Sequence, residues 1–319
     1  MNPSASIIIP NWNGLRHLET CLTAVFDQIY QDFEVIVVDN GSEDGSQAYI
    51  RNHFPAVRLV ELQENRGFTG ACNSGYEIAL GTYIILLNND TEADPDWLTQ
   101  LLSAFERHPD VGILASRIML YDRRDYFHAA GDFYRLNAIP GNRGVWQEDA
   151  GQFSSEAQVF SACGAAAAYR RSMLDEIGFL DDRFYFSCED IDLAWRAHLA
   201  NWKVLYVPTA IVYHKLKATG GSVTGSYFDG RNFLYLIWKN YPWSLLKNHW
   251  PAILKAQFEI TYQALRAWRG PAARARLRGQ VAGYLGLMKM FPSRRQIQAS
   301  RRISDDDLNT LLSPVDETP

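Results

Sequence analysis

The chain has 319 residues, of which 47% are hydrophobic and 21% are charged, and its formal net charge is -5. These proportions exclude a fibre or a disordered tail and allow one large or two modest globular domains. Four widely spaced cysteines without a CxxC pair indicate reduced thiols. The N-terminal residues show no signal-peptide pattern, and no run approaches the ~18 apolar residues of a membrane-spanning helix. We therefore expect a cytoplasmic protein, either free or held peripherally at the inner face of the cell membrane.

The first half of the chain alternates between strand and helix patterns. Short β-branched or apolar runs predict strands at residues 6–10, 33–38, 57–62 and 82–87. Apolar residues at helical spacing predict a helix at residues 15–28. Residues 46–53 and 70–80 lie between predicted strands and are also expected to be helical. Near-continuous apolar strands separated by helices indicate an α/β fold, with a parallel sheet covered on both faces.

Polar side chains follow each of these four strands. They are Asn11 and Asn13, then Asp39 and Asn40, then Asn65 and Arg66, and finally Asn88, Asn89 and Asp90. Turn chemistry alone explains any one cluster, because turns favour Asn and Asp. Four clusters at four consecutive strand ends predict a ligand site, since open α/β sheets bind ligands at the carboxyl ends of their strands. No GxGxxG or GxxxxGK[ST] is present, so a phosphate group would be bound by a metal ion or by side chains.

The middle of the chain is less regular. Residues 118–157 mix aromatic and polar residues, which suits either a loop that binds a sugar or a lipid-linked molecule or a folded insertion, and residues 161–168 predict a strand of small residues. Glu189 and Asp190 precede an amphipathic helix, where acidic residues also complement the helix dipole. Asp192 and Arg196, at i and i+4, are interpreted as a surface ion pair. His214 follows a strand-like run at residues 203–207.

The C-terminal part is basic and aromatic. Between Arg231 and Arg302 the sole acidic residue is Glu259, and helices are predicted at residues 227–241 and 250–290. This composition is typical of an interfacial helix attracted to an anionic membrane, although a homodimer face or packing against the rest of the protein would also explain it. A nucleic-acid partner is not expected, because the sequence contains no recognisable nucleic-acid module. Residues 304–319 are acidic and contain proline, which predicts a disordered tail.

Four segments in order resemble the family 2 glycosyltransferases. They are SIIIPNWNG, VIVVDNGSEDGS, ENRGFTGACNSGYEIALGTYIILLNNDTEADPDWL and FYFSCEDIDLAWRAHLANWKVLYVPTAIVYHK. The resemblance covers residues 6–217 and continues more faintly to residue 242. It implies an inverting enzyme with the GT-A nucleotide-diphospho-sugar transferase fold, a mixed, mainly parallel sheet flanked by helices. Residues 1–222 would then form the catalytic domain, and residues 223–303 a C-terminal helical extension.

Within the family, the sequence looks most similar to bacterial rhamnosyltransferases of cell-surface polysaccharide assembly. This likeness implies transfer of a sugar, such as L-rhamnose from dTDP-rhamnose, to a glycan or lipid-linked acceptor. The alternative is a catalytically impaired protein of the same fold that binds nucleotide sugars or acts as a scaffold. Asn88 raises this alternative, because it replaces the first carboxylate of the family's Asp-x-Asp motif.

The resemblance also implies roles for individual residues. Asp190 would be the base that deprotonates the acceptor, and Glu189 would orient the acceptor. Asp90, which retains the last Asp of Asp-x-Asp, and His214 would bind Mg2+ or Mn2+. The alternatives are that His214 is a satisfied core or loop residue and that the protein is a metal-independent variant. The residues implied in nucleotide-sugar binding are Pro10, Asn11, Asn13, Asp39, Arg66, Asn88, Asn89 and Asp90. For Arg66, the alternative is an ordinary surface salt bridge.

Overall fold

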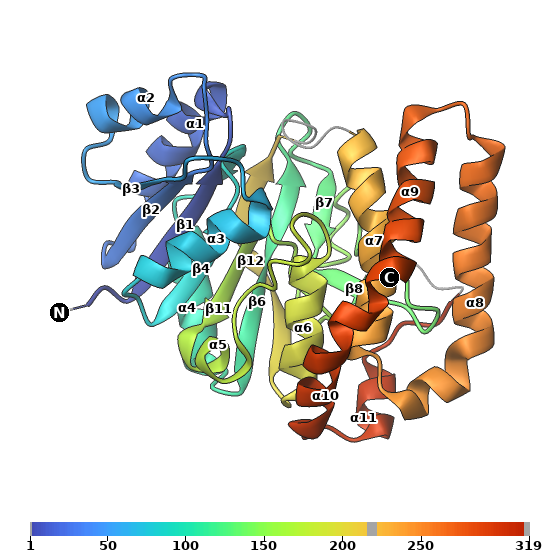
Figure 1. Ribbon diagram of the computed structural model, residues 1–319. Coiled ribbons are helices and arrows are strands. Elements are labelled where there is room, and N and C mark those ends of the chain that lie inside the picture. The colour runs from blue at the N-terminus through green and yellow to red at the C-terminus, as the bar shows by residue number, and fades with distance from the viewer. Residues whose placement is uncertain (1, 216–221, 316–319) are drawn as a thin grey trace.

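A mixed sheet with helices on both faces forms the centre of the computed structural model, which describes residues 2–215 and 222–315 (Figure 1). The strands of the main sheet run in the order β10-β12-β6-β11-β4-β1-β2-β3, with β5 beside β12 and β7 beside β6. Their bounds are β1 Ala5–Asn11, β2 Phe33–Asp39, β3 Arg58–Glu61, β4 Tyr83–Leu87, β5 Thr91–Ala93, β6 Val111–Leu120, β7 Phe127–Ala130, β10 Ala157–Gln158, β11 Ala166–Arg170 and β12 Lys203–His214.

The first four strands confirm the predicted parallel arrangement. β4, β1, β2 and β3 are parallel neighbours, whereas β11 is antiparallel to both β4 and β6. Ile8 of β1 packs into one core cluster, and Ile7 and Ile9 pack into a second. Because successive side chains of a strand point to opposite faces, this division shows that both faces of the sheet are buried.

Two sets of helices cover the sheet. One core contains residues of α1 Leu15–Phe26, α2 Ser46–His53 and α4 Trp97–Arg107. The other contains residues of α3 Gly67–Ile78, α5 Arg171–Ile177 and α6 Glu189–Leu199. The predicted small-residue strand is shifted, because Ala166 is the first residue to pair with β4 and residues 161–165 form a connection.

The segment expected to be irregular, residues 118–157, contains short strands. After β7, the strands β8 Asp132–Tyr134 and β9 Pro140–Asn142 form a separate antiparallel pair. Asp132 also forms a bridge with Ser161. The segment is therefore a folded insertion that lies against the connection between β10 and β11.

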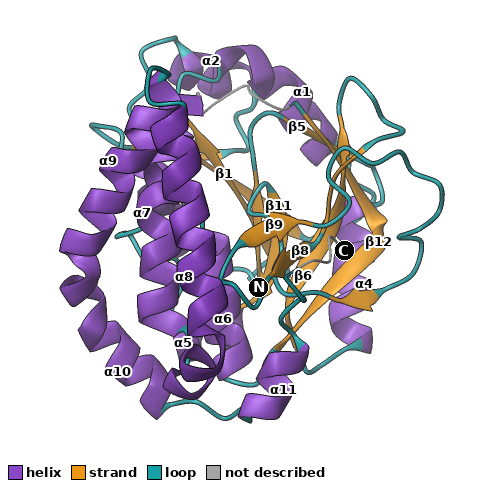
Figure 2. Ribbon diagram, turned by 90° about the vertical axis from the view of Figure 1, so that its right-hand side faces the viewer, coloured by secondary structure: helices purple, strands orange, loops and turns teal. Residues whose placement is uncertain are grey.

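The C-terminal helices are α7 Ser222–Asn240, α8 Trp243–Arg266, α9 Pro271–Gly286, a 3-10 turn Leu287–Met290, α10 Phe291–Ala299 and α11 Asp305–Thr310. The single helix expected at residues 250–290 is thus divided, since α8 ends before Pro271 and α9 begins with it. Residues of α7 and α8 belong to the same core as β1, α3 and α6. Figures 1 and 2 show α8 as the outermost helix at this end of the molecule.

The prediction of a disordered tail is wrong for residues 304–315. Ser304 caps α11 by accepting a hydrogen bond from the Asp307 amide at 3.0 Å. Leu308 and Leu312 are buried in the main core, so apolar burial orders a segment whose composition is otherwise polar. Residues 316–319 of the predicted tail lie outside the described residues.

Candidate active site

A cavity of about 450 Å³ opens at the carboxyl ends of β1, β2 and β4. Four of the residues expected to bind nucleotide sugar line it, and they are Pro10, Asn11, Asn88 and Asn89. The remaining lining residues are Trp12, Asn40, Asn65, Gly67, Phe68, Tyr185, Phe186 and Thr224. The strand-end clusters therefore meet around one hollow, as the sheet topology requires.

Hydrogen bonds between side chains fix the floor of this cavity. The buried Asp39 carboxylate accepts from Asn11 Nδ2 at 2.9 Å, from the Ser42 amide at 2.9 Å and from Gln47 Nε2 at 2.7 Å. Asn11 Oδ1 in turn accepts from Asn89 Nδ2 at 2.7 Å. Asp39 is not among the lining residues, so its role in this structure is to orient Asn11 and, through it, Asn89.

Asn13 and Arg66 lie outside the cavity lining. Asn13 has a left-handed backbone, with φ of 49°, and its side-chain oxygen accepts from the Glu43 amide at 2.9 Å, which is turn chemistry. The Arg66 side chain is exposed, and its amide donates to Asn40 Oδ1 at 2.8 Å. Its neighbours Asn65 and Gly67 line the cavity, so Arg66 lies at its edge.

Asp90 and His214 lie together, 124 residues apart in the sequence. Antiparallel pairing of β12 with β5 brings the end of β12 beside the loop after β4, and His214 Nε2 lies 3.0 Å from Asp90 Oδ1. The other nitrogen, Nδ1, lies 3.0 Å from Nδ1 of His128 on β7. Burial and the neighbouring His214 lower the pKa of His128 to about 3, so His128 is neutral. No sequence pattern pointed to His128.

A second cavity, of about 480 Å³, adjoins the first. The two share the lining residues Phe68, Asn88 and Phe186. Both acidic residues of the predicted catalytic pair, Glu189 and Asp190, line the second cavity, as does His214. The two cavities therefore meet at this shared wall.

Backbone amides hold the Asp190 carboxylate in place. Its Oδ2 accepts from the Gly164 amide at 2.9 Å and its Oδ1 from the Ile191 amide at 2.8 Å. Burial raises the pKa of Asp190, although these amide hydrogen bonds favour the ionised form. Burial and then the charge of Asp190 raise the pKa of Glu189 well above its usual range. Both carboxyl groups are therefore harder to ionise than a carboxyl group in water.

The loop before Glu189 depends on α7. Ser187 and Cys188 have positive φ angles of 70° and 66°, an uncommon conformation for residues with side chains. Asn232 Nδ2 donates to the carbonyl oxygens of Phe184, Phe186 and Ser187 at 3.1, 3.0 and 2.7 Å. The first C-terminal helix therefore holds the segment that delivers both acidic residues to the cavity.

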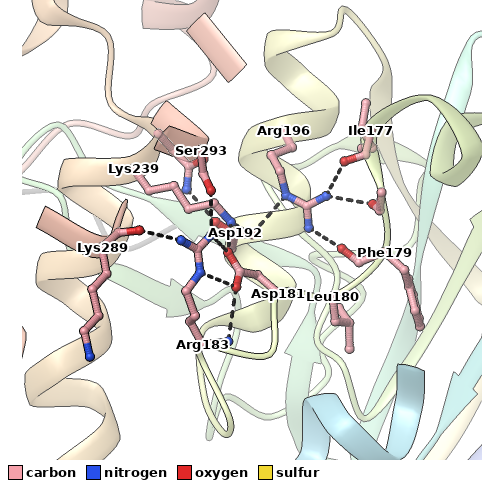
Figure 3. A network of polar contacts seen from close by, with 12 residues as sticks. Ile177, Phe179, Leu180, Asp181, Arg183, Asp192, Arg196, Lys239, Lys289 and Ser293 are labelled. Carbon is pink, nitrogen blue, oxygen red and sulfur yellow. Dashed lines mark hydrogen bonds and ion pairs between the residues drawn. The ribbon is translucent and has the colours of Figure 1, made fainter. Parts of the chain in front are cut away.

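Asp192 and Arg196 do not form the surface pair that the sequence suggested. Asp192 is fully buried and accepts from Arg196 Nε at 3.0 Å, from Lys239 Nζ at 2.7 Å and from Asn240 Nδ2 at 2.8 Å (Figure 3). Lys239 also contacts Asp181 at 2.6 Å. Spacing along α6 predicted the pair correctly, but α7 covers it, and the result is a buried ionic cluster.

The comparisons with known proteins agree with this geometry. The family model for glycosyl transferase family 2 matches residues 6–178, more than half of the chain. The chain belongs to glycosyl transferase family 2. Its fold is the GT-A fold, and the protein is a glycosyltransferase.

Named relatives include a rhamnosyltransferase and a poly-N-acetylglucosamine synthase. The glycosyltransferase is 29% identical, over 64% of its chain and 74% of the relative, to N-acetylglucosaminyl-diphospho-decaprenol L-rhamnosyltransferase of Mycobacterium tuberculosis. It is 24% identical to poly-beta-1,6-N-acetyl-D-glucosamine synthase of Staphylococcus epidermidis, over 78% of its chain and 57% of that relative.

Solved structures share the fold at low sequence identity. The Pyrobaculum calidifontis mannosyltransferase PcManGT, in complex with GDP-Man and Mn2+, matches with a TM-score of 0.58 and 19% identity, covering 94% of this chain and 85% of that one. TarS 1-349 of S. aureus, in complex with UDP, matches with a TM-score of 0.56 and 16% identity, covering 94% of this chain and 91% of that one.

The helices within residues 2–215 and 222–315 include none with the length and apolar character of a membrane span.

Proposed function

We propose that this glycosyltransferase moves a sugar from a nucleoside diphosphate to a hydroxyl group of a glycan or lipid-linked acceptor, with inversion at the anomeric carbon. The observation that supports this most strongly is the Asp190 carboxylate, held by two backbone amides in a cavity that adjoins the strand-end cavity. The first cavity would take the nucleotide sugar and the second the acceptor. Direct transfer between them needs no covalent intermediate on the protein.

In the proposed reaction Asp190 is the base. The acceptor oxygen attacks the anomeric carbon from the side opposite the diphosphate and gives its proton to Asp190. The new carbon–oxygen bond forms as the bond to the diphosphate breaks, and the nucleoside diphosphate leaves with its negative charge. A carboxylate whose pKa is raised by burial takes up a proton more readily than one in water. Glu189 would hydrogen-bond a second acceptor hydroxyl and orient it.

The leaving diphosphate needs positive charge, and Asp90 and His214 fit a divalent cation. Mg2+ and Mn2+ commonly bind through one or two protein groups together with substrate phosphates. Among residues 2–215 and 222–315 no group of three or more His, Cys, Asp or Glu side chains is arranged to hold a metal, so substrate would supply much of the coordination. When bound, such a cation would neutralise charge that develops on the diphosphate. Asn88 would add a hydrogen bond to the donor but no charge.

The donor proposed for testing first is dTDP-L-rhamnose. The name of the 29% identical mycobacterial relative supports rhamnose and a lipid-diphosphate-linked acceptor. Asn11 and Asn89 would contact the nucleotide directly, and Asp39 would act by orienting them. Arg66, exposed at the cavity edge, would reach the base or the phosphates, and Asn13 would hold the adjoining turn.

The exposed face of α8 favours binding to a membrane surface. Five large apolar side chains recur there at helical spacing, and they are Trp250, Leu254, Phe258, Tyr262 and Leu265, each more than half exposed. Exposed basic residues accompany them on α8, α9 and the turn between, namely Lys247, Lys255, Arg266, Arg269, Arg274 and Arg278. An apolar stripe with basic neighbours fits an anionic bilayer, where a lipid-linked acceptor would be found.

Release of nucleoside diphosphate tests the proposed chemistry. Purified protein is incubated with a panel of nucleotide sugars and a polyprenyl-diphosphate acceptor, with Mn2+ or with a chelator. We expect release from one donor, faster with Mn2+, and at least about a hundredfold lower kcat for Asp190→Asn, since a positioned base contributes this much. The wild-type rate should rise with pH through the raised pKa of Asp190, because the ionised carboxylate alone accepts a proton.

The exposed Asp27→Asn is the control, and it should leave kcat unchanged. Wild-type turnover by Asp190→Asn would refute the assignment of the base. Binding of a nucleotide sugar without any release would instead support a nucleotide-sugar-binding scaffold.

A further inference from the structure

Asp132 is a buried carboxyl group in the second cavity to which the proposed reaction gives no role. It is 3% exposed, begins β8 and lines the cavity together with Glu189 and Asp190. Its Oδ1 accepts from Asn142 Nδ2 at 2.7 Å, and Asn142 belongs to the same wall. Burying a carboxyl group is costly unless it is protonated or paired, so this placement calls for an explanation.

The backbone ties Asp132 to the segment that carries the proposed base. The Asp132 amide donates to the Ser161 carbonyl at 2.9 Å, and the Ser161 hydroxyl donates to the Asp190 carbonyl at 3.3 Å. The same connection, three residues further on, supplies the Gly164 amide to the Asp190 carboxylate. The two carboxyl groups therefore have a fixed relation, set by residues 161–164.

The surroundings of Asp132 favour its neutral form. Burial, followed by the negative charge of Asp190, raises the pKa of Asp132 well above its usual range, and the hydrogen bond from Asn142 opposes this only partly. The other titratable groups that line the cavity are Cys163, Glu189, Asp229, His128 and His214. A carboxylic acid, unlike a carboxylate, can donate a hydrogen bond as well as accept one.

A second carboxyl group in the cavity has an oxygen atom that a ligand could contact. Glu189 is 6% exposed, and its Oε2 has no hydrogen-bond partner among the described residues. A buried polar atom without a partner is uncommon, and a ligand group is one way to satisfy it. The cavity thus offers one oxygen that lacks a donor and, at Asp132, a group that both donates and accepts.

We propose that Asp132 binds a hydroxyl group of an uncharged acceptor sugar, beside the hydroxyl that Asp190 deprotonates. The inference rests on the proposed function, because it assigns the second cavity to the acceptor. Four acidic side chains line this cavity, Asp132, Glu189, Asp190 and Asp229, so the part of the acceptor that enters it should carry no carboxylate or phosphate, and a diphosphate link to a lipid would lie outside it. Asp132 is an acceptor-binding residue, and Asp190 remains the base.

Calorimetric titration of the full-length protein tests this independently of turnover. The probe is N-acetylglucosaminyl diphosphoprenol with a short prenyl chain, titrated with nucleoside diphosphate present. We expect Asp132→Leu to weaken acceptor binding at least about tenfold, as for a lost buried hydrogen bond to substrate, and to leave nucleoside diphosphate affinity within about twofold. The exposed Asp122→Asn, in the same insertion, is the matched control and should bind as the wild type does.

Asp132→Asn keeps a donor and an acceptor in nearly the same shape and tests the protonated state. Its acceptor affinity should match the wild type at neutral pH and fall less steeply at higher pH, because Asp132 ionises in the wild type in addition to Glu189, which both proteins share. The inference is overturned if wild-type protein does not bind the probe, if Asp132→Leu binds it normally, or if Asp132→Asn and wild type lose affinity in parallel with pH. Failure of donor release with intact acceptor binding would count against the proposed transfer reaction and not against this role.

Discussion

At the scale of single residues, Gly14 shows how closely the strand ends are packed. A Cβ atom there would lie 2.0 Å from Asn89 Nδ2 and 2.5 Å from Asn11 Oδ1, the two atoms that hydrogen-bond each other on the cavity floor. The backbone of Gly14 has a φ of -109°, which any residue adopts, so steric contact alone excludes a side chain. A substitution at Gly14 therefore disturbs the Asn11–Asn89 contact while both amide side chains keep their chemistry.

Gly14→Ala should therefore weaken nucleoside diphosphate binding by about tenfold, because it breaks that hydrogen bond and moves both lining residues. Calorimetry with the nucleoside diphosphate released by the active donor measures the effect. Gly225→Ala is the control, since a Cβ atom on that residue of α7 meets nothing within 4 Å. Equal affinities for Gly14→Ala and wild type would mean that Asn11 and Asn89 do not contact the nucleotide.

At the scale of elements, the buried ionic cluster joins α6 to α7. Lys239 of α7 is 2% exposed and contacts both Asp181 and Asp192. Burial pushes the pKa of Asp181 up, but hydrogen bonds and charge from Arg183 and Lys239 hold it below its usual range. Asp181 therefore stays ionised, and both Asp181 and Asp192 contact cationic partners.

Lys239→Met should lower the free energy of unfolding by about 3–5 kcal/mol, because it leaves buried carboxylates without their shared cation. Urea denaturation followed by circular dichroism measures this change. The exposed Lys247→Met, a few residues further along the chain, should change stability by less than about 0.5 kcal/mol. A small effect for Lys239→Met would show that Arg183 and Arg196 neutralise the cluster without it.

The lengths of the strands explain which site residues could be predicted from the sequence. Asn11 ends β1, and Asn88 and Asn89 follow β4. These strands have seven and five residues and are largely apolar, so local patterns were sufficient to place the three amides at one edge of the sheet. His128 and Asp132 lie on strands of four and three residues, which are too short to give a periodic pattern and depend on pairing with distant segments. Asp192 was misplaced for a related reason, because no pattern within α6 shows that α7 covers it.

At the scale of the whole molecule, the α8 stripe predicts attachment to anionic membranes. Leu254→Glu with Phe258→Glu should weaken binding to vesicles of phosphatidylcholine and phosphatidylglycerol by more than about tenfold, since burying each such side chain is worth about 1.5–3 kcal/mol. Binding to pure phosphatidylcholine should be weaker for wild type. Flotation with vesicles provides the measurement.

Asn248→Glu with Gln263→Glu is the control, because it adds the same charge at exposed positions of α8 outside the stripe. Wild-type protein that stays with the unbound fraction contradicts the prediction. A homodimer that the Leu254→Glu, Phe258→Glu pair dissociates, seen by sedimentation velocity, would assign the stripe to a second copy of the chain.

The connection between Ala162 and Ala166 has one more consequence. Its Ala165 carbonyl accepts from the Asn88 amide at 2.9 Å, on the donor side, and its Gly164 amide donates to Asp190, on the acceptor side. In the proposed reaction, this turn sets the distance between the leaving group and the base. Substitutions around Asn40 and Asn65 could then change the specificity for the sugar nucleotide. Substitutions on β8 and β9 could change the specificity for the acceptor. Neither set would alter the distance that the turn maintains. Specificity on the two sides could diverge separately in evolution or by design, as long as no residue is inserted into that turn.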